Sequence, residues 1–127
     1  MKKILIVDDE PTILMTMSHV LSGKDTMVIT SSRIEEAEEA LGRYTFDLVI
    51  ADIRLSGMEG IEGLELLSYV KQISPVTEVI IMTAYGSDEM REEAQKRGAF
   101  HYYEKPIDIP HLLKKIQTLN LPVNTKG

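Results

Sequence analysis

The stretch Ile4-Leu5-Ile6-Val7-Asp8-Asp9-Glu10 shows the pattern that organises the chain: an unbroken aliphatic run leads directly into acidic residues. The aliphatic part of this stretch, together with Lys3, forms the run Lys3–Val7. Such a run is typical of a strand buried on both faces of a parallel sheet. Similar runs follow at Met27–Thr30, Leu48–Ala51, Val79–Met82 and, less regularly, Phe100–Tyr103. The sequence therefore predicts five strands.

Apolar residues at helical spacing occupy the segments between these runs. We expect the first helix to begin near Pro11 and to close at Gly23. For the second we expect a capping box of Ser32 and Glu35 at its beginning and a stop at Gly42.

The last three predicted helices differ in their apolar anchoring. A third is expected over about Gly63–Ser74, and a fifth follows Asp108, a typical N-terminal cap. The fourth, at about Ser87–Arg97, has only Met90 and Ala94 as apolar residues at helical spacing. Because most helical stability comes from packing an apolar face, this helix should be easy to shift.

Alternation of five strands with five helices implies right-handed crossovers and an α/β fold built as a three-layer sandwich around a parallel sheet. The chain of 127 residues is long enough for one domain with a real core. We expect this domain to span residues 1–119, and residues 120–127 to form a polar tail or the start of a linker.

The composition excludes several classes of protein. With 14 Lys and Arg against 20 Asp and Glu, the net charge is −6, which argues against a broadly basic binder of nucleic acid or membrane surfaces. Cysteine is absent, so disulfides, thiolate metal sites and thiol catalysis are excluded. The early apolar run Ile4–Val7 is too short for a signal peptide or a membrane span, and we expect a cytoplasmic protein.

Chemically capable residues follow four of the five predicted strands, at the end of the sheet where such folds place their working site. They are the acidic stretch Asp8–Glu10, then Asp52, Thr83 and Lys105. Clustered carboxylates need a cation, and an all-oxygen set favours Mg²⁺. A threonine hydroxyl and a lysine suit phosphoryl oxygens. A carboxylate in these surroundings can attack phosphorus and form an aspartyl phosphate.

Each residue also has an ordinary structural interpretation. The stretch Asp8–Glu10 could simply favour the positive end of a helix dipole, and Asp52 could be a common strand-to-loop acid. Thr83 alone is most often a strand terminator, and Lys105 alone a surface lysine. Their occurrence together at separate strand ends favours the chemical interpretation.

Four segments in a fixed order make the chain resemble the receiver domain of two-component response regulators. The resemblance covers roughly residues 1–119, and it rests on Ile4-Leu5-Ile6-Val7-Asp8-Asp9-Glu10, Asp47-Leu48-Val49-Ile50-Ala51-Asp52-Ile53-Arg54-Leu55, Met82-Thr83-Ala84-Tyr85-Gly86 and Gly98-Ala99-Phe100-His101-Tyr102-Tyr103-Glu104-Lys105-Pro106. It implies a flavodoxin-like fold with strand order 2-1-3-4-5.

The resemblance implies a role for each acid at the strand ends. Asp52 matches the residue that accepts a phosphoryl group from a histidine kinase or phosphotransfer protein. Asp8 and Asp9 match the pair that binds Mg²⁺, together with Asp52 and the backbone carbonyl of Arg54.

The remaining family positions concern binding of the phosphoryl group and switching. Thr83 and Lys105 match the positions that bind the phosphoryl group and couple it to conformational change. Tyr102 matches the aromatic residue whose ring moves inward on activation, and the Lys105–Pro106 bond is cis in the family.

The loop after Asp52 departs from the common family pattern. Ser56 stands where many receivers have proline. Ile61-Glu62-Gly63 separates Gly60 from the leucines that begin at Leu64, which indicates an insertion of about three residues. It should lengthen this loop or extend the front of the third helix.

Arg54 and Tyr85 occupy variable positions that flank the phosphoryl group in the family and tune its hydrolysis. Both side chains are bulky and could obstruct the attacking water. The hypothesis is a long-lived phosphoryl group.

The resemblance implies a phosphorylation-activated switch, not an enzyme acting on other molecules. On phosphorylation, the surface formed by the fourth helix, the fifth strand and the fifth helix is expected to change its binding partners. Those partners include an output domain or effector, or a second copy in a phosphorylation-dependent homodimer, without direct nucleic-acid or membrane binding. A phosphatase with an aspartyl-phosphate intermediate is the alternative. We expect it less, because Arg54 stands where such phosphatases have a second acid and 127 residues leave no room for a cap domain. A nucleotide- or flavin-binding module is a third, although no glycine-rich loop follows the first strand.

Overall fold

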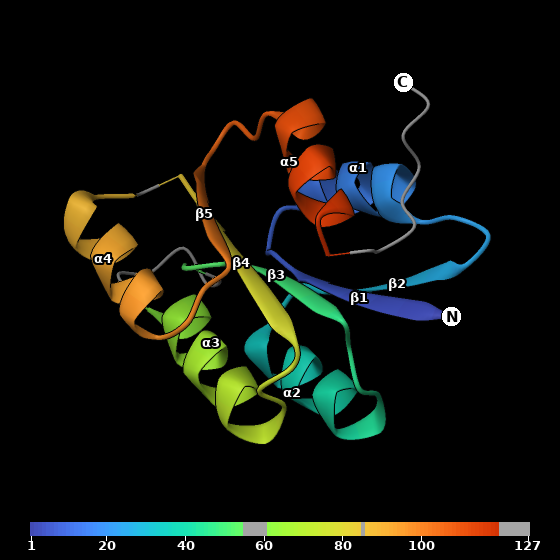
Figure 1. The fold of residues 1–127 in the computed structure, drawn as a ribbon, viewed down its shortest axis with the longest axis horizontal. Coiled ribbons are helices and arrows are strands. Elements are labelled where there is room, and N and C mark those ends of the chain that lie inside the picture. Colours follow the sequence, from blue (N-terminus) through green and yellow to red (C-terminus); the bar gives the residue numbers. More distant parts are fainter. Residues whose placement is uncertain (55–60, 85, 120–127) are drawn as a thin grey trace.

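The computed structural model describes residues 1–54, 61–84 and 86–119, in which strands and helices alternate along the chain (Figure 1). The strands are β1 (Lys2–Val7), β2 (Thr26–Ser31), β3 (Leu48–Asp52), β4 (Glu78–Thr83) and β5 (His101–Glu104). The helices are α1 (Pro11–Leu21), α2 (Ile34–Arg43), α3 (Glu62–Ile73), α4 (Asp88–Lys96) and α5 (Ile109–Gln117). The predicted order of elements is confirmed.

All neighbouring strands pair in parallel, in the order β2-β1-β3-β4-β5 (Figure 1). This confirms the predicted parallel sheet and the strand order that the family resemblance implied. The register brings the ends of neighbouring strands together: Val7 lies beside Ala51, one residue before the end of β3, and Thr83 lies beside Glu104. The carboxyl ends of β1, β3, β4 and β5 therefore form one edge.

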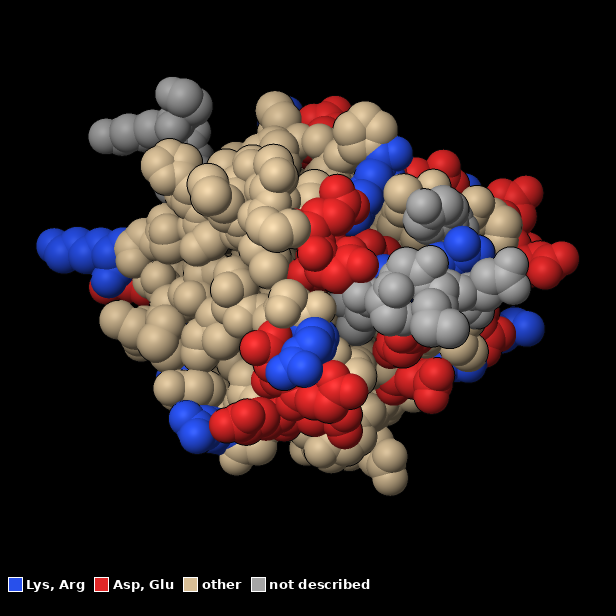
Figure 2. Space-filling view, turned by 180° about the vertical axis from the view of Figure 1, so that it is seen from behind, with Lys and Arg blue, Asp and Glu red and all other residues tan. Residues whose placement is uncertain are grey.

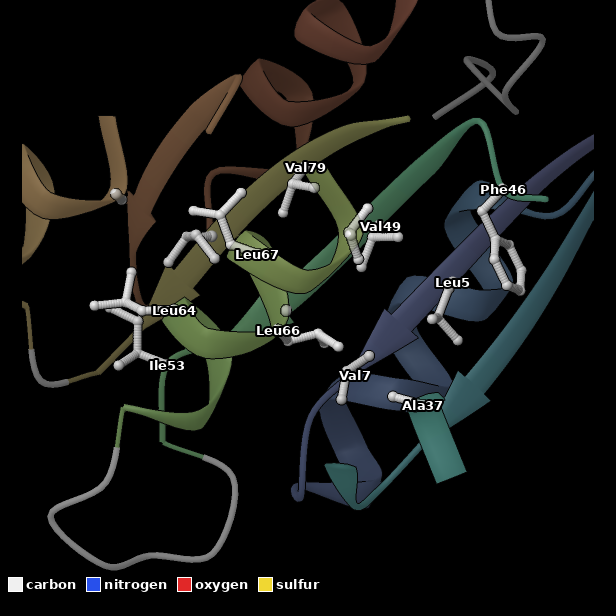
Figure 3. Close-up of a cluster of buried hydrophobic side chains, with 14 of the residues drawn as sticks. Leu5, Val7, Ala37, Phe46, Val49, Ile53, Leu64, Leu66, Leu67 and Val79 are labelled. Atoms are coloured by element: carbon white, nitrogen blue, oxygen red, sulfur yellow. The ribbon is translucent and has the colours of Figure 1, made fainter. Parts of the chain in front are cut away.

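Helices cover both faces of the sheet, with α1 and α5 on one side and α2, α3 and α4 on the other (Figure 1). Successive residues of β1 alternate between these two cores: Leu5 and Val7 belong to the cluster on the α2–α4 side, and Ile4 and Ile6 to the one beneath α1 and α5. Figure 3 shows Leu5 and Val7 among the side chains of the first cluster. Burial on both faces explains the unbroken aliphatic runs.

Two predicted helix boundaries are wrong. Helix α1 ends at Leu21 with Ser22 as its C-cap, so Gly23 lies outside the cap. Helix α2 continues through Gly42 to Arg43, because Gly42 does not adopt the left-handed backbone conformation by which a glycine ends a helix. Glycine lowers helix stability but does not end a helix whose other residues pack well.

The predicted capping box of Ser32 with Glu35 is also wrong by one position. Both the N–H and the Oγ of Ser32 donate to Oε1 of Glu36, each at 2.9 Å. Arg33 is extended (φ −140°, ψ 157°), so the helix begins at Ile34 and the acid that faces Ser32 is one residue further along. The backbone hydrogen bond from Ser32 lowers the pKa of Glu36.

Helix α3 begins against the end of β3. The N–H of Gly63 donates to the backbone oxygen of Ile53 at 2.9 Å, and a Cβ atom at position 63 would overlap the backbone carbonyl of Asp52. Of the apparent insertion, Glu62 and Gly63 lie in the first turn of α3 and Ile61 is its N-cap. Ser56 and Gly57–Gly60 lie outside the described residues.

Helix α4 has the thin anchoring that its sequence predicts. Ala94 is its buried residue, and Met90 is half-buried against the α2–α4 core. Ser87 caps its beginning by accepting from the Met90 N–H at 3.1 Å. Asp108 caps α5 in the same way, as predicted, through the His111 N–H at 3.1 Å.

No helix in the described part of the chain combines the length and the apolar character that crossing a membrane requires.

Candidate functional site

The residues predicted at separate strand ends meet at Lys105, which directly follows β5. Its Nζ lies 2.8 Å from Oδ2 of Asp8, 2.8 Å from Oε1 of Glu10 and 2.9 Å from Oδ2 of Asp52. The Lys105 N–H also donates to the backbone oxygen of Thr83 at 2.8 Å, which ties the end of β5 to the end of β4. Four segments distant in sequence are thereby held at one point.

The centre of this cluster is buried. Asp8 is 0% exposed, Asp52 is 5% exposed and the Lys105 side chain is 8% exposed. Ions removed from water lose several kcal/mol of hydration each, and only close pairing and hydrogen bonds offset this loss. The second oxygen of each aspartate is accordingly occupied: the Glu10 N–H donates to Asp8 Oδ1 at 2.8 Å, and the Arg54 N–H donates to Asp52 Oδ1 at 3.2 Å.

Burial and pairing act in opposite directions on the titration of these groups. Burial raises the pKa of Asp8 and of Asp52, and the hydrogen bonds from Lys105 offset only part of the rise. Burial alone would lower the pKa of Lys105, but its hydrogen bonds to Asp8, Glu10 and Asp52 outweigh burial and raise the pKa. The lysine is therefore firmly protonated, and it neutralises part of the negative charge.

The cluster offers oxygen ligands to a cation. One carboxylate oxygen from each of Asp8, Asp9, Glu10 and Asp52 lies within 4.8 Å of the others. Asp9 and Glu10 are exposed, and Figure 2 shows acidic side chains gathered near the middle of the rear face. A set of carboxylates without histidine or cysteine fits Mg²⁺, a hard cation that is usually bound through one or two carboxylates and several waters.

Thr83 and Arg54 lie where the sequence predicts them. Thr83 is the last residue of β4 and is fully buried. Arg54 is half-buried two residues after Asp52. Tyr85, the other predicted flanking residue, lies outside the described residues.

Tyr102 and Tyr103 point to opposite faces of β5, as the strand's alternation requires. Tyr102 belongs to the α2–α4 core, and a Cβ atom at position 86 would overlap its Oη. The Arg91 guanidinium carbon lies 5.3 Å from the Tyr102 ring centroid, and Arg91 Nη2 lies 3.4 Å from Glu104 Oε1. Helix α4 is thus linked to β5 across the predicted switch residue.

Tyr103 belongs to the core beneath α1 and α5. Its Oη is 2.7 Å from Nδ1 of His111, so this ring connects β5 to α5. Burial raises the pKa of Tyr103 to about 12. Because Tyr102 lies on the opposite face of β5, it is the tyrosine that faces α4.

Sequence reasoning missed Glu10 as a partner of Lys105. The two residues are 95 positions apart, and their contact depends on β3 and β4 lying between β1 and β5. The available signal was the position of Glu10 directly after two candidate site acids. The Lys105–Pro106 bond is cis, as the resemblance implied.

Comparison with known proteins identifies the family. The family model of the response regulator receiver domain matches residues 4–117. The response regulator protein PilR of Pseudomonas aeruginosa is 38% identical over 117 residues, covering 92% of this chain and 26% of PilR. The DNA-binding transcriptional regulator NtrC of Escherichia coli is 35% identical over 112 residues, covering 88% of this chain and 23% of NtrC. The chain thus spans about a quarter of these relatives.

A solved structure agrees in fold. The beryllofluoride-activated NtrC4 receiver domain dimer superposes with a TM-score of 0.83 at 29% identity, covering 94% of this chain and 96% of that one. With the family match over residues 4–117, this shows that the chain belongs to the receiver domains of two-component response regulators, which act as phosphorylation-activated signalling switches.

Proposed function

We propose that Asp52 is the phosphoacceptor of this receiver domain. A carboxylate oxygen of Asp52 attacks the phosphorus of a phosphohistidine on a histidine kinase or phosphotransfer protein. An O–P bond forms, the N–P bond breaks, and its electron pair returns to the imidazole nitrogen. The observation that carries the proposal is the buried Asp52 carboxylate held 2.9 Å from Lys105 at the edge where β1, β3 and β4 also end.

Two further groups contact the transferred phosphoryl in this proposal. The Lys105 ammonium, 2.9 Å from Oδ2 of Asp52, pairs with a phosphoryl oxygen, and the Thr83 hydroxyl donates to another. Both residues adjoin Asp52 through the paired ends of β3, β4 and β5.

The same proposal assigns Mg²⁺ to Asp8, Asp9, Asp52 and the backbone carbonyl of Arg54. Receiver domains generally bind Mg²⁺ at an acidic pocket, and the oxygen cluster of this chain fits that cation. When bound, Mg²⁺ neutralises charge that would otherwise repel an incoming phosphoryl group.

Switching is assigned to Tyr102 and helix α4. Phosphorylation draws the Thr83 hydroxyl toward Asp52, and the Tyr102 ring and α4 adjust together. Support comes from the thin apolar anchoring of α4 and from Arg91, which contacts both Tyr102 and Glu104. A helix with so little buried surface can exchange between two positions at small cost in free energy.

The face of α4, β5 and α5 is proposed to exchange partners on phosphorylation. These partners are an output domain or effector, or a second copy of the chain in a phosphorylation-dependent homodimer. The NtrC4 receiver domain is a dimer when activated, and NtrC itself is a DNA-binding regulator. The proposal places this domain in the cytoplasm and leaves contact with DNA to other parts of such regulators.

Phosphorylation of Asp52 is tested with a small phosphodonor. With acetyl phosphate and Mg²⁺, intact-mass spectrometry should show one added phosphoryl group that is stable to acid and released by hydroxylamine. Asp52→Asn should abolish it, and Asp25→Asn, which alters an exposed aspartate between α1 and β2, should leave it unchanged. Phosphorylation of Asp52→Asn to the wild-type extent would refute the assignment.

Arg54 and Tyr85 are proposed to slow hydrolysis of the phosphoryl group by obstructing water. We expect Arg54→Ala and Tyr85→Ala each to shorten the phosphoryl half-life by about threefold to tenfold, equivalent to about 0.7–1.4 kcal/mol. The half-life is measured by loss of the added mass after the phosphodonor is removed. An unchanged half-life in both variants would contradict this role.

A further inference from the structure

Three carboxylates share the Lys105 ammonium, and they differ sharply in exposure. The side chains of Asp8 and Asp52 are 0% and 7% exposed, whereas that of Glu10 is 55% exposed. Asp8 and Asp52, besides their ion pairs with Lys105, each accept a hydrogen bond from a backbone N–H. Lys105 is the partner of the Glu10 carboxylate among the described residues. Glu10 is therefore the partner that can release Lys105 most easily.

The backbone of Glu10 is fixed even though its side chain is exposed. Its N–H donates to Asp8 Oδ1 at 2.8 Å, and its carbonyl accepts from the Leu14 N–H at 3.1 Å at the beginning of α1. Movement of Glu10 away from Lys105 thus needs only rotation of its side chain. The site and the helix keep their backbone positions.

We propose that Glu10 is a positioning residue that holds the Lys105 ammonium at the mouth of the site and competes with the incoming phosphoryl group for it. This inference rests on the proposed phosphorylation of Asp52. Glu10 contributes its negative charge where a phosphoryl anion must approach Lys105. It also adds to the charge that attracts a divalent cation, because its carboxylate lies within the cluster of acidic oxygens.

The Glu10→Gln variant should be phosphorylated faster but should bind Mg²⁺ more weakly. At saturating Mg²⁺, removal of the competing charge frees Lys105 for the phosphoryl group, and phosphorylation by acetyl phosphate should be about threefold to fivefold faster, the size expected for an exposed ion pair. The dissociation constant for Mg²⁺, measured by calorimetry, should rise by about twofold to fivefold because the cluster loses one negative charge.

Two matched variants separate the bridge from general charge. Glu10→Asp keeps the charge on a side chain that is one methylene shorter, which weakens its contact with Lys105, so phosphorylation should accelerate partway while Mg²⁺ affinity stays at the wild-type value. Glu38→Gln removes one negative charge from an exposed position of α2 and should leave both quantities unchanged. Wild-type phosphorylation rates in both Glu10 variants, or equal acceleration in Glu38→Gln, would overturn the proposal.

A readout without phosphorylation keeps this inference distinct from the proposed function. In nuclear magnetic resonance spectra of protein carrying ¹⁵N-lysine, the Nζ resonance of Lys105 should shift in Glu10→Gln and stay in place in Glu38→Gln. An unmoved resonance in Glu10→Gln would overturn the bridge even if Asp52 is phosphorylated. A shifted resonance in a chain that acetyl phosphate does not modify would refute the proposed function and leave the bridge intact.

Discussion

Replacement of Lys105 by methionine should lower the free energy of unfolding by about 3 kcal/mol at pH 8 without divalent cations. The substitution keeps an apolar stem of similar length but removes the ammonium that pairs with buried Asp8 and Asp52. Two buried carboxylates then face each other without a cation. Urea unfolding followed by circular dichroism measures the loss.

The destabilisation by Lys105→Met should depend on pH and on Mg²⁺. Burial already raises the pKa of Asp8 and Asp52, and loss of the Lys105 hydrogen bonds raises it further. An acid whose folded pKa exceeds its unfolded value destabilises the folded state above the folded pKa, and the loss disappears as the pH falls through that pKa toward about 4. Mg²⁺ should also restore stability, because the proposed Mg²⁺ site is formed by carboxylates that only folding brings together.

Lys2→Met is the matched control for this experiment. Lys2 lies 3.8 Å from Asp47, and both side chains are substantially exposed, so its replacement should change stability by less than about 1 kcal/mol at any of these pH values. A loss in Lys105→Met that stays constant between pH 4 and pH 8 would contradict the electrostatic explanation.

Gly63→Ala should destabilise the fold by about 2–3 kcal/mol. The added Cβ atom would overlap the backbone carbonyl of Asp52 and approach the Cα atom of Ile53. Backbone atoms cannot move aside as a flexible side chain can, so α3 must shift away from β3 and lose packing of Leu64 and Leu67, which are buried in the α2–α4 core.

Gly42→Ala is the control for this substitution. Gly42 lies within α2, and nothing comes within 4 Å of a Cβ atom placed there. Alanine at this position should stabilise the protein by about 0.5–1 kcal/mol, because it restricts the unfolded chain and favours the helix. Equal stability changes in the two variants would show that crowding at Asp52 is not the cause. The Gly63→Ala variant should also be phosphorylated more slowly, since the added Cβ atom overlaps the backbone of Asp52 itself.

Helix boundaries show where local sequence signals are insufficient. The apolar spacing placed α2 correctly, but an extended Arg33 moved its first turn by one residue and paired Ser32 with Glu36 in place of Glu35. Capping geometry depends on one or two backbone angles, and neighbouring acids such as Glu35 and Glu36 satisfy the same pattern. Only the three-dimensional backbone distinguishes them.

The sequence by itself determined the alternation of strands and helices, because strands buried on both faces need continuous aliphatic runs such as Ile4–Val7. It also determined which residues lie at the carboxyl ends of the strands, including Asp8, Asp52 and Lys105. The strand order came from the family resemblance, since periodicity along the chain carries no information on which strands are neighbours. The structure confirms that order.

Only the tertiary structure decided how these residues meet. It brought Glu10 into contact with Lys105, which is 95 residues away, and Gly63 into contact with the backbone of Asp52. It also directed Tyr102 toward α4 and Tyr103 toward α5. The physical reason is that such contacts depend on the distances between strands and on the packing of helices on the sheet. Those quantities arise when the whole chain folds, and no local pattern encodes them.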